Sequence, residues 1–356
     1  MPAAPADWQT VLAASVRSPA ELCRLVGLPP AVAAEAEGAA AGFPVLVPRP
    51  YLDRIRRGDP DDPLLRQVLP RAAELAETPG YSTDPLHEAD AAVCPGLLSK
   101  YHGRSLMVAT AACAVHCRFC FRRHFRYSDS VEAAAATVGA AVVLPPPAAD
   151  GRGGSTTATP TVDFSLVLQR ISAEDSLDEV VLSGGDPLVL PDRQLAELAH
   201  RLAAIPHLKR LRIHTRMPVV IPQRVTDDLL GWVRATRLTL IIVVHVNHPA
   251  EIDGAVAVAL GRLVDAGVPV LSQAVLLRGV NDRANVLETL YRRLVDLRVM
   301  PYYLHQLDLV AGAAHFAVPE ATGIALIAQL RARLPGYAVP RYVRETPGAT
   351  HKEVLA

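Results

Sequence analysis

The segment CAVHCRFCFRRHF, residues 113–125, holds three of the chain's five cysteines in the spacing C-x3-C-x2-C. It lies just after the apolar run SLMVA, which begins at Ser105 and has the composition of a buried strand. In parallel α/β barrels, active sites are built at the carboxyl ends of the strands. The position of the cysteines therefore indicates a reactive site at that end of a parallel sheet.

From Ser105 onward, short apolar runs alternate with amphipathic segments. The predicted strands start near residues 105, 179, 210, 238, 269 and 300, and predicted helices cover 192–203, 227–235, 254–266 and 285–297. Strands that alternate with helices predict βαβ units and a parallel sheet. Because the strands are apolar throughout, an α/β fold with a partial TIM-like barrel of about six units is favoured. Periodicity alone leaves a doubly wound open sheet as the alternative.

The remaining segments differ in composition from this central region. Residues 1–98 are rich in Ala, Leu and Pro with helical spacing, which predicts an N-terminal helical region ahead of the barrel at 99–316. Residues 317–356 are predicted to form a short C-terminal tail. Within the barrel, residues 131–162 are low in charge and rich in Ala, Pro, Gly and Thr, as expected of a poorly ordered surface insertion.

Composition narrows the class of protein. The 356 residues are 50% hydrophobic, with 36 basic and 36 acidic side chains, so the balance favours neither nucleic-acid binding nor a basic membrane-binding patch. An odd number of cysteines, three of them clustered, favours a reducing cytoplasm over a disulfide framework. We expect no signal peptide in MPAAPADWQT, and the longest apolar run, residues 238–246, is too short to span a bilayer.

Three cysteines on one loop can bind three irons of a 4Fe–4S cluster through their thiolates. The fourth iron then has no protein ligand and can bind a small molecule, as an open coordination position does in catalytic zinc sites. Two alternatives remain at this point. One is a structural zinc site with His116 or His124 as the fourth ligand, and the other is three unrelated buried thiols.

Five segments together resemble one enzyme family: CAVHCRFCFRRHF, LSGGDPL, QAVLLRGVND, MPYYLHQLDLVAGAAHF and GYAVPRYVRETPG. They are similar to the lysine 2,3-aminomutases of the radical S-adenosylmethionine (SAM) superfamily, most of all to those that serve elongation factor P. The resemblance runs from about Phe43 to Lys352, without the insertion. It implies that Cys113, Cys117 and Cys120 hold a 4Fe–4S cluster, which binds SAM and cleaves it to a 5′-deoxyadenosyl radical.

The loop SGGDPL follows the second predicted strand. It contains Ser183, Gly184, Gly185 and Asp186. Glycines let a backbone pass close to a ligand, and the resemblance implies that this loop receives the methionine ammonium of SAM. The alternative is an ordinary turn in which the aspartate caps a helix. His214 and His245 end the next two predicted strands and are expected to face the same site.

A second cofactor, pyridoxal phosphate (PLP), is implied by the resemblance. Lys100, Tyr101 and Arg104 could hold a phosphate, and the family's phosphate-binding residues match these positions. A solvated basic loop is the alternative. PLP also needs a lysine for covalent attachment, and the layout of AVPRYVRETPGATHK matches Lys352 to that role. The tail must then fold back over the mouth of the barrel.

The resemblance also implies three residues that bind free L-lysine at its two ends. Arg122 matches the residue that pairs with the substrate carboxylate, a role that suits the planar guanidinium fork. Asp282 and Glu345 match two acidic positions that receive the ε-ammonium group. Alternatively, Asp282 caps a helix, and Glu345 pairs with Arg341 or Arg344 on the surface.

The implied reaction converts L-α-lysine to β-lysine by hydrogen abstraction and migration of the amino group from Cα to Cβ. The implied partners are an electron donor such as flavodoxin or ferredoxin and, indirectly, a ligase that acts on elongation factor P. An aminomutase for glutamate or arginine is the nearest rival, although an acidic pair argues against glutamate. A non-catalytic zinc-binding scaffold is the rival from another class.

Overall fold

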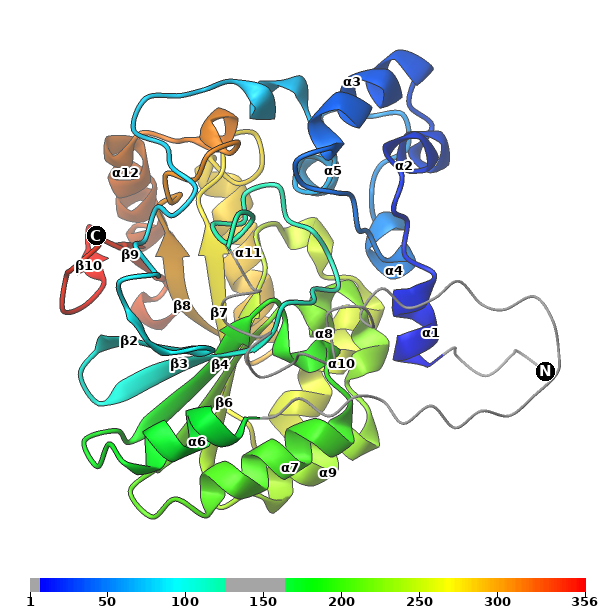
Figure 1. The fold of residues 1–356 in the computed structure, drawn as a ribbon. Coiled ribbons are helices and arrows are strands. Elements are labelled where there is room, and N and C mark those ends of the chain that lie inside the picture. The colour runs from blue at the N-terminus through cyan, green and yellow to red at the C-terminus, as the bar shows by residue number, and fades with distance from the viewer. Residues whose placement is uncertain (1–6, 126–163) are drawn as a thin grey trace, which may run out of the picture.

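The computed structural model describes residues 7–125 and 164–356, so the predicted insertion at 131–162 lies outside the described residues. Its centre is one ten-stranded sheet in which the strands lie in chain order from β1 to β10 (Figure 1). The seven strands from β3 to β9 are parallel to one another. Antiparallel strands β1 and β2 extend one edge, and β10 extends the other.

The strands are β1 Ala92–Cys94, β2 Leu97–Tyr101, β3 Arg104–Thr110, β4 Glu179–Gly184, β5 Arg210–Thr215, β6 Thr239–His245, β7 Val270–Val275, β8 Met300–His305, β9 Arg341–Arg344 and β10 Glu353–Val354. The six predicted strands are confirmed as β3 to β8. The predicted number of parallel strands was one too small, because β9 lies in the segment expected to be a tail. A doubly wound sheet reverses its strand order, whereas this order never reverses, so that alternative is excluded.

Helices connect the successive parallel strands. They are α6 Ser165–Ser172, α7 Asp192–Ala203, α8 Met217–Val220, α9 Asp227–Ala235, α10 Gly254–Asp265, α11 Ala284–Asp296 and α12 Glu320–Arg331. Side-chain caps fix two of their starts: Thr226 accepts from the backbone N–H of Leu229 before α9, and Asp253 accepts from that of Val256 before α10. Within the described ranges, none of the helices is both long and apolar enough to cross a bilayer.

The N-terminal segment is mainly helical. It contains α1 Trp8–Ala13, α2 Pro19–Val26, α3 Pro30–Ala40, α4 Arg49–Leu52, α5 Pro63–Arg66 and a 3-10 turn at Ala72–Leu75. Figure 1 shows these helices grouped on one side of the sheet. The division at residue 98 falls inside β2, and β9 joins residues 341–344 to the sheet, so neither the first nor the last predicted segment is separated from the barrel by a linker.

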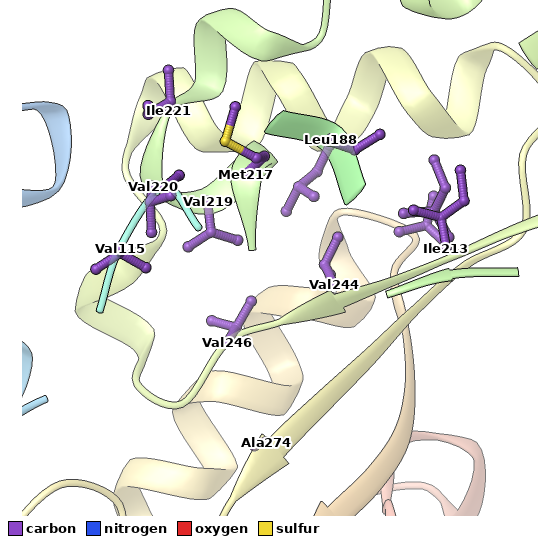
Figure 2. Packing of buried hydrophobic residues seen from close by; sticks show 14 of the residues in the cluster. Val115, Leu188, Ile213, Met217, Val219, Val220, Ile221, Val244, Val246 and Ala274 are labelled. Atoms are coloured by element: carbon purple, nitrogen blue, oxygen red, sulfur yellow. The ribbon is translucent and has the colours of Figure 1, made fainter. Parts of the chain in front are cut away.

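A hydrophobic core joins the N-terminal helices, the sheet and the connecting helices. Figure 2 shows how it includes the cysteine loop: Val115 lies beside Val219 and Val220 of α8, with Val246, just beyond β6, nearby. All four side chains are buried. Burial of apolar surface therefore anchors the loop between its first two cysteines.

Candidate active site

One cavity of about 470 Å³ lies at the carboxyl ends of the parallel strands. It is lined by the predicted site residues Lys100, Tyr101, Arg104, Cys113, Cys117, Cys120, Arg122, Ser183, Gly184, Gly185, Asp186, Glu345 and Lys352. His214 and His245 line it as well, as expected. Because residues from every strand between β2 and β8 border this one cavity, the sheet curves around it as a partial barrel. Asp282 is half-buried in the β7–α11 connection and is not part of the cavity wall.

The end of β4 positions the start of the cysteine loop. The backbone N–H of Gly185 donates to the carbonyl of Thr110 at 2.7 Å, and that of Asp186 donates to the carbonyl of Ala112 at 2.8 Å. A Cβ atom on Gly185 would lie 2.1 Å from the Ala112 carbonyl oxygen. Gly184, at φ 111°, is also crowded, since a Cβ there would lie 2.7 Å from the Thr110 carbonyl oxygen and 2.8 Å from Val108. The glycines thus make room for the cysteine loop, and because both also line the cavity, their expected role beside a ligand stays a prediction.

The N-terminal region holds the other side of the cysteine loop. Glu74, in the 3-10 turn Ala72–Leu75, accepts from Arg118 at 2.6 Å and from Arg123 at 2.8 Å. Arg118 also donates to the carbonyl of Phe43 at 2.6 Å. All three charged side chains are at most 4% exposed, so each is compensated by its partners and not by water. The loop is therefore fixed from both sides before any ligand binds.

The three thiols of the loop are unpaired and border the cavity. Burial and the nearby Cys120 raise the pKa of Cys113 well above its usual range, and burial and Cys117 raise the pKa of Cys120 to about 12. As thiolates, the three sulfurs would repel one another. A cationic metal centre compensates these charges and so favours the thiolate form. The donor set thus fits an iron–sulfur cluster.

A zinc site is not supported. Among the described residues, no three Cys, His, Asp or Glu side chains converge on one metal ion. This geometry is compatible with a 4Fe–4S cluster, because each thiolate then binds a different iron. The proposed zinc ligands have other partners: the His116 ring contacts the Pro44 carbonyl at 2.8 Å, and the His124 ring contacts the Ala311 carbonyl at 3.1 Å.

Arg122 reaches the cavity, but its guanidinium already has protein partners. Nε and Nη2 donate to the two carboxylate oxygens of Glu88 at 2.7 and 2.8 Å, and Nη1 donates to the hydroxyl of Ser183 at 2.9 Å. Burial alone would raise the pKa of Glu88, but the Arg122 cation outweighs it and lowers that pKa. The bidentate fork expected to bind a substrate carboxylate is thus occupied by a buried glutamate.

Glu345 pairs with two lysines and not with Arg341 or Arg344. Its carboxylate contacts the ammonium groups of Lys352 and, at 3.3 Å, Lys100. Burial would raise the pKa of Glu345, yet these two cations lower it to about 2. Lys100 also lies 3.5 Å from Glu88. A continuous series of alternating charges therefore runs along the cavity wall from Arg122 to Lys352, and the predicted acidic pair of Glu345 and Asp282 does not form.

The alternative interpretation of Asp186 as a cap is confirmed. It accepts from the backbone N–H of Leu188 at 3.1 Å, the Thr215 hydroxyl at 2.7 Å, and the backbone N–H groups of Arg216 and Met217 at 2.6 and 3.1 Å. These four donors hold the carboxylate between β4 and β5. Its predicted contact with the methionine ammonium of SAM stays a prediction.

The opposite part of the cavity has features that fit PLP. The Arg104 guanidinium lies 4.7 Å from the centre of the Tyr101 ring and forms no ion pair within the described part of the chain. The ring Nε2 of His214 is buried without a hydrogen-bond partner there. Burial, with nearby cations, lowers the pKa of His214, and burial and Lys352 lower that of His305 to about 3. A free cation, neutral imidazoles and Lys352 can accommodate a phosphorylated aromatic aldehyde.

Sequence reasoning missed several residues at this site. Asp308 borders the cavity and makes no ion pair with any described residue, and burial together with Glu345 raises its pKa to about 7. Glu88 and Arg216 also border it. The available signals were position and sequence context: Arg216 directly follows β5, and Asp308 lies three residues beyond β8, within a segment quoted for its resemblance.

Comparison with curated proteins gives consistent relatives. L-lysine 2,3-aminomutase of Escherichia coli (strain K12) is 42% identical over 98% of this chain and 94% of its own length. The protein of that name from Haemophilus influenzae is 39% identical over 98% and 96%, and that from Clostridium subterminale is 36% identical over 85% and 66%. A scan against protein-family models finds no match.

Solved structures give weaker matches. Streptococcus suis SuiB bound to S-adenosylmethionine has a TM-score of 0.44 at 11% identity, covering 69% of this chain and 51% of that one. A radical SAM methyltransferase from Sphaerobacter thermophilus has a TM-score of 0.35 at 21% identity, covering 49% and 53%. TM-scores below 0.5 support no conclusion about this chain.

The singly wound parallel sheet and the three thiols beyond its first parallel strand, taken with the curated relatives, define an isomerase built on a partial α/β barrel. Identities of 39–42% over nearly the whole of both chains narrow the assignment further. The chain belongs to the L-lysine 2,3-aminomutase family of isomerases.

Proposed function

We propose that this enzyme converts L-lysine to β-lysine with the help of a 4Fe–4S cluster, SAM and PLP. The observation that carries the proposal is the shared cavity of Lys352 and the three thiols, which come from opposite ends of the sheet. Of the three lysines in the chain, Lys209 is exposed and lies outside this cavity. Lys352 lies on the wall in a segment that pairs with β9 through β10.

Each cofactor has residues that would hold it. Cys113, Cys117 and Cys120 would bind the cluster, and Lys352 would attach PLP, with Arg104 and Tyr101 facing its phosphate. Together the bound groups supply a 5′-deoxyadenosyl radical for hydrogen abstraction and an aromatic ring that stabilises a migrating amino group. The protein's part is to hold these groups in place and to keep water and oxygen out of the cavity.

The charges of the wall suit the two ends of lysine. The α-carboxylate is proposed to bind beside the Arg122 cation, whose N–H groups also donate to Glu88 and Ser183. The ε-ammonium is proposed to bind near Glu345 and Asp308. Because two lysines already neutralise Glu345, Asp308 is the carboxylate with capacity left for another cation. This replaces Asp282, which is not part of the cavity wall.

A second carboxylate on the substrate would be repelled by this acidic side, so glutamate is a poor substrate candidate. Arginine carries a cation at the end of its side chain, so this repulsion does not exclude it, and it is included as a substrate in the test below.

We further propose that flavodoxin or ferredoxin supplies the electron and that the product serves a ligase acting on elongation factor P. All five cysteines are unpaired, which supports a reducing cytoplasm as the place of reaction.

The test is anaerobic turnover of L-lysine, L-arginine and L-glutamate with SAM, PLP and a reductant, with chromatography of the products. We expect β-lysine from lysine only. Lys352→Ala should abolish turnover and prevent trapping of PLP by borohydride, while its iron and sulfide content stays normal. Lys209→Ala is the matched control and should behave as wild type. Normal PLP trapping in Lys352→Ala would refute the lysine assignment, and a lack of sulfide in the wild type would refute the whole proposal.

A further inference from the structure

A buried arginine beyond β5 donates to one of the three thiols. Nη1 of Arg216 lies 2.7 Å from Sγ of Cys117, and Arg216 is only 6% exposed. The same guanidinium borders the cavity. No comparable side-chain donor is seen at Cys113 or Cys120 among the described residues, so the three thiols are not equivalent.

The guanidinium is fixed by further contacts. Nη2 donates to Oε1 of Gln67 at 2.6 Å and to Oε2 of Glu251 at 2.9 Å, and the backbone N–H of Arg216 donates to Asp186 at 2.6 Å. Glu251 is itself held by the backbone N–H of Asn247 at 3.0 Å. These contacts come from the N-terminal region and from the ends of β4 and β6, so Nη1 stays directed at the sulfur.

We propose that Arg216 is a positioning residue that raises the reduction potential of the 4Fe–4S cluster by donating a charge-assisted hydrogen bond to the Cys117 thiolate. The inference rests on the cluster of the proposed function. Reduction adds one electron, taken from the reductant, and no bond forms or breaks. The reduced cluster carries one more negative charge, so an adjacent cation and an N–H···S bond stabilise it more than the oxidised cluster.

A purely structural role for Arg216 would be to neutralise Glu251. Two features argue that its function extends to the cluster. Glu251 accepts from Nη2 of Arg216, from Gln67 at 3.1 Å and from two backbone N–H groups, so its compensation does not involve Nη1, which donates to sulfur. In addition, Nε of Arg216 is buried without a partner among the described residues, so the pairing with Glu251 does not use every donor of this guanidinium.

The test is a redox titration of the anaerobically reconstituted cluster without SAM, followed by electron paramagnetic resonance. Arg216→Gln should lower the ratio of reduced to oxidised cluster at least tenfold at a fixed potential, which equals about 59 mV for one electron. Arg216→Lys keeps the charge, so the reduction potential of its cluster should lie between those of Arg216→Gln and the wild type. Arg224→Gln is the control, because Arg224 is also fully buried but donates to Leu188 and Asp192.

The outcomes separate this inference from the proposed function. A wild type without sulfide would overturn the proposed function itself. A wild type with its cluster and an Arg216→Gln variant of equal iron and sulfide content that titrates identically would overturn only the role of Arg216. If Arg216→Gln does not retain a cluster, the reduction potential of Arg216→Lys is measured in its place. A potential equal to that of the wild type in Arg216→Lys would then refute the inference. An equal shift in Arg224→Gln would show a general structural effect and refute it as well.

Discussion

At the scale of single residues, the active-site cavity is defined by paired charges. Arg122, Glu88, Lys100, Glu345 and Lys352 follow one another with alternating sign along its wall. Buried pairs of this kind add little net stability when complete, but removal of one partner leaves an uncompensated charge. The pairing explains how a cavity can hold several ionised groups before substrate binds, and it gives each member a measurable effect.

Replacement of Glu88 should show the cost of leaving a buried cation without its partner. Glu88→Ala leaves the Arg122 guanidinium, 4% exposed, without its carboxylate, so we expect the free energy of unfolding to fall by about 3 kcal/mol. Urea denaturation of the cluster-free protein measures it. Glu21→Ala is the control, since its partner Arg49 is 41% exposed and such pairs contribute about 0–1 kcal/mol. Equal losses in both variants would contradict the assignment.

Asp308 should give the stability of the protein a specific pH dependence. Its pKa of about 7 lies above the value of 3.8 of an unperturbed aspartate, so the folded state binds the proton more tightly than the unfolded state. Its contribution is then fully present below about pH 3.8 and is lost as the pH rises through 7. Asp308→Asn removes this loss. The melting temperature of the variant minus that of the wild type should therefore increase as the pH is raised from 5 to 8.

The same variant tests the substrate site. If Asp308 receives the ε-ammonium, Asp308→Asn should raise KM for lysine at least tenfold, with a smaller effect on kcat. Asp282→Asn, which lies off the cavity wall, should leave KM within about twofold of wild type. The reverse result would restore Asp282 to the role that the sequence predicted for it.

At the scale of elements, the important contact is between the end of β4 and the loop that carries the cysteines. Gly184 and Gly185 pass within van der Waals contact of the backbone at Thr110 and Ala112. Side chains of almost any kind would push the loop away from the sheet. The spacing of the thiols therefore depends on residues about 70 positions further along the chain, which belong to the next strand of the sheet.

Gly185→Ala tests this contact. The added Cβ would lie 2.1 Å from the Ala112 carbonyl oxygen, so the loop must shift, and we expect lower stability and at least a twofold loss of bound iron. Gly231→Ala, in α9, meets no atom within 4 Å and should be neutral or stabilising. Iron analysis after reconstitution is the measurement, and full iron content in Gly185→Ala would show that the loop tolerates the shift.

At the scale of the whole molecule, the C-terminal segment completes both the sheet and the site. The backbone N–H of Leu355 donates to the carbonyl of Tyr342 at 2.8 Å, and the backbone N–H of Tyr342 donates to the carbonyl of Ala356 at 2.9 Å. Leu355 and Ala356 pack against the hydrophobic core. These contacts hold the turn from which Lys352 reaches the cavity, so the position of that lysine depends on the four residues after it.

Removal of residues 353–356 should therefore loosen Lys352 while leaving the cysteine loop intact. We expect at least a tenfold weaker retention of PLP with unchanged iron content, measured by cofactor analysis after gel filtration. Val354→Ala is the control, because this side chain is 58% exposed and contributes little packing. Equal PLP retention in the truncated protein would show that the turn holds itself in place.

Much of the fold could be predicted from sequence because local pattern determines it. Most strands from β3 to β8 are apolar runs bounded by polar turns, and β5, RLRIHT, alternates polar and apolar residues; most of the helices after them are amphipathic. Strand β9 was missed because RYVR is short and half polar, and it is a strand through its pairing with β8 on one side and β10 on the other. At the site, residue types were predicted better than their partners, because the pairing of Arg122 with Glu88 depends on tertiary contacts that no spacing reveals.

Because each parallel strand pairs with the one synthesised just before it, the sheet can grow in the direction of translation, one hairpin or βαβ unit at a time. The cysteines emerge near the beginning of this growth, whereas Glu345 and Lys352 emerge only after β9. During biogenesis the three thiols can thus be in place well before Glu345 and Lys352. If the proposed function holds, the order in which the cluster and PLP are installed follows from the direction in which the ribosome reads the message.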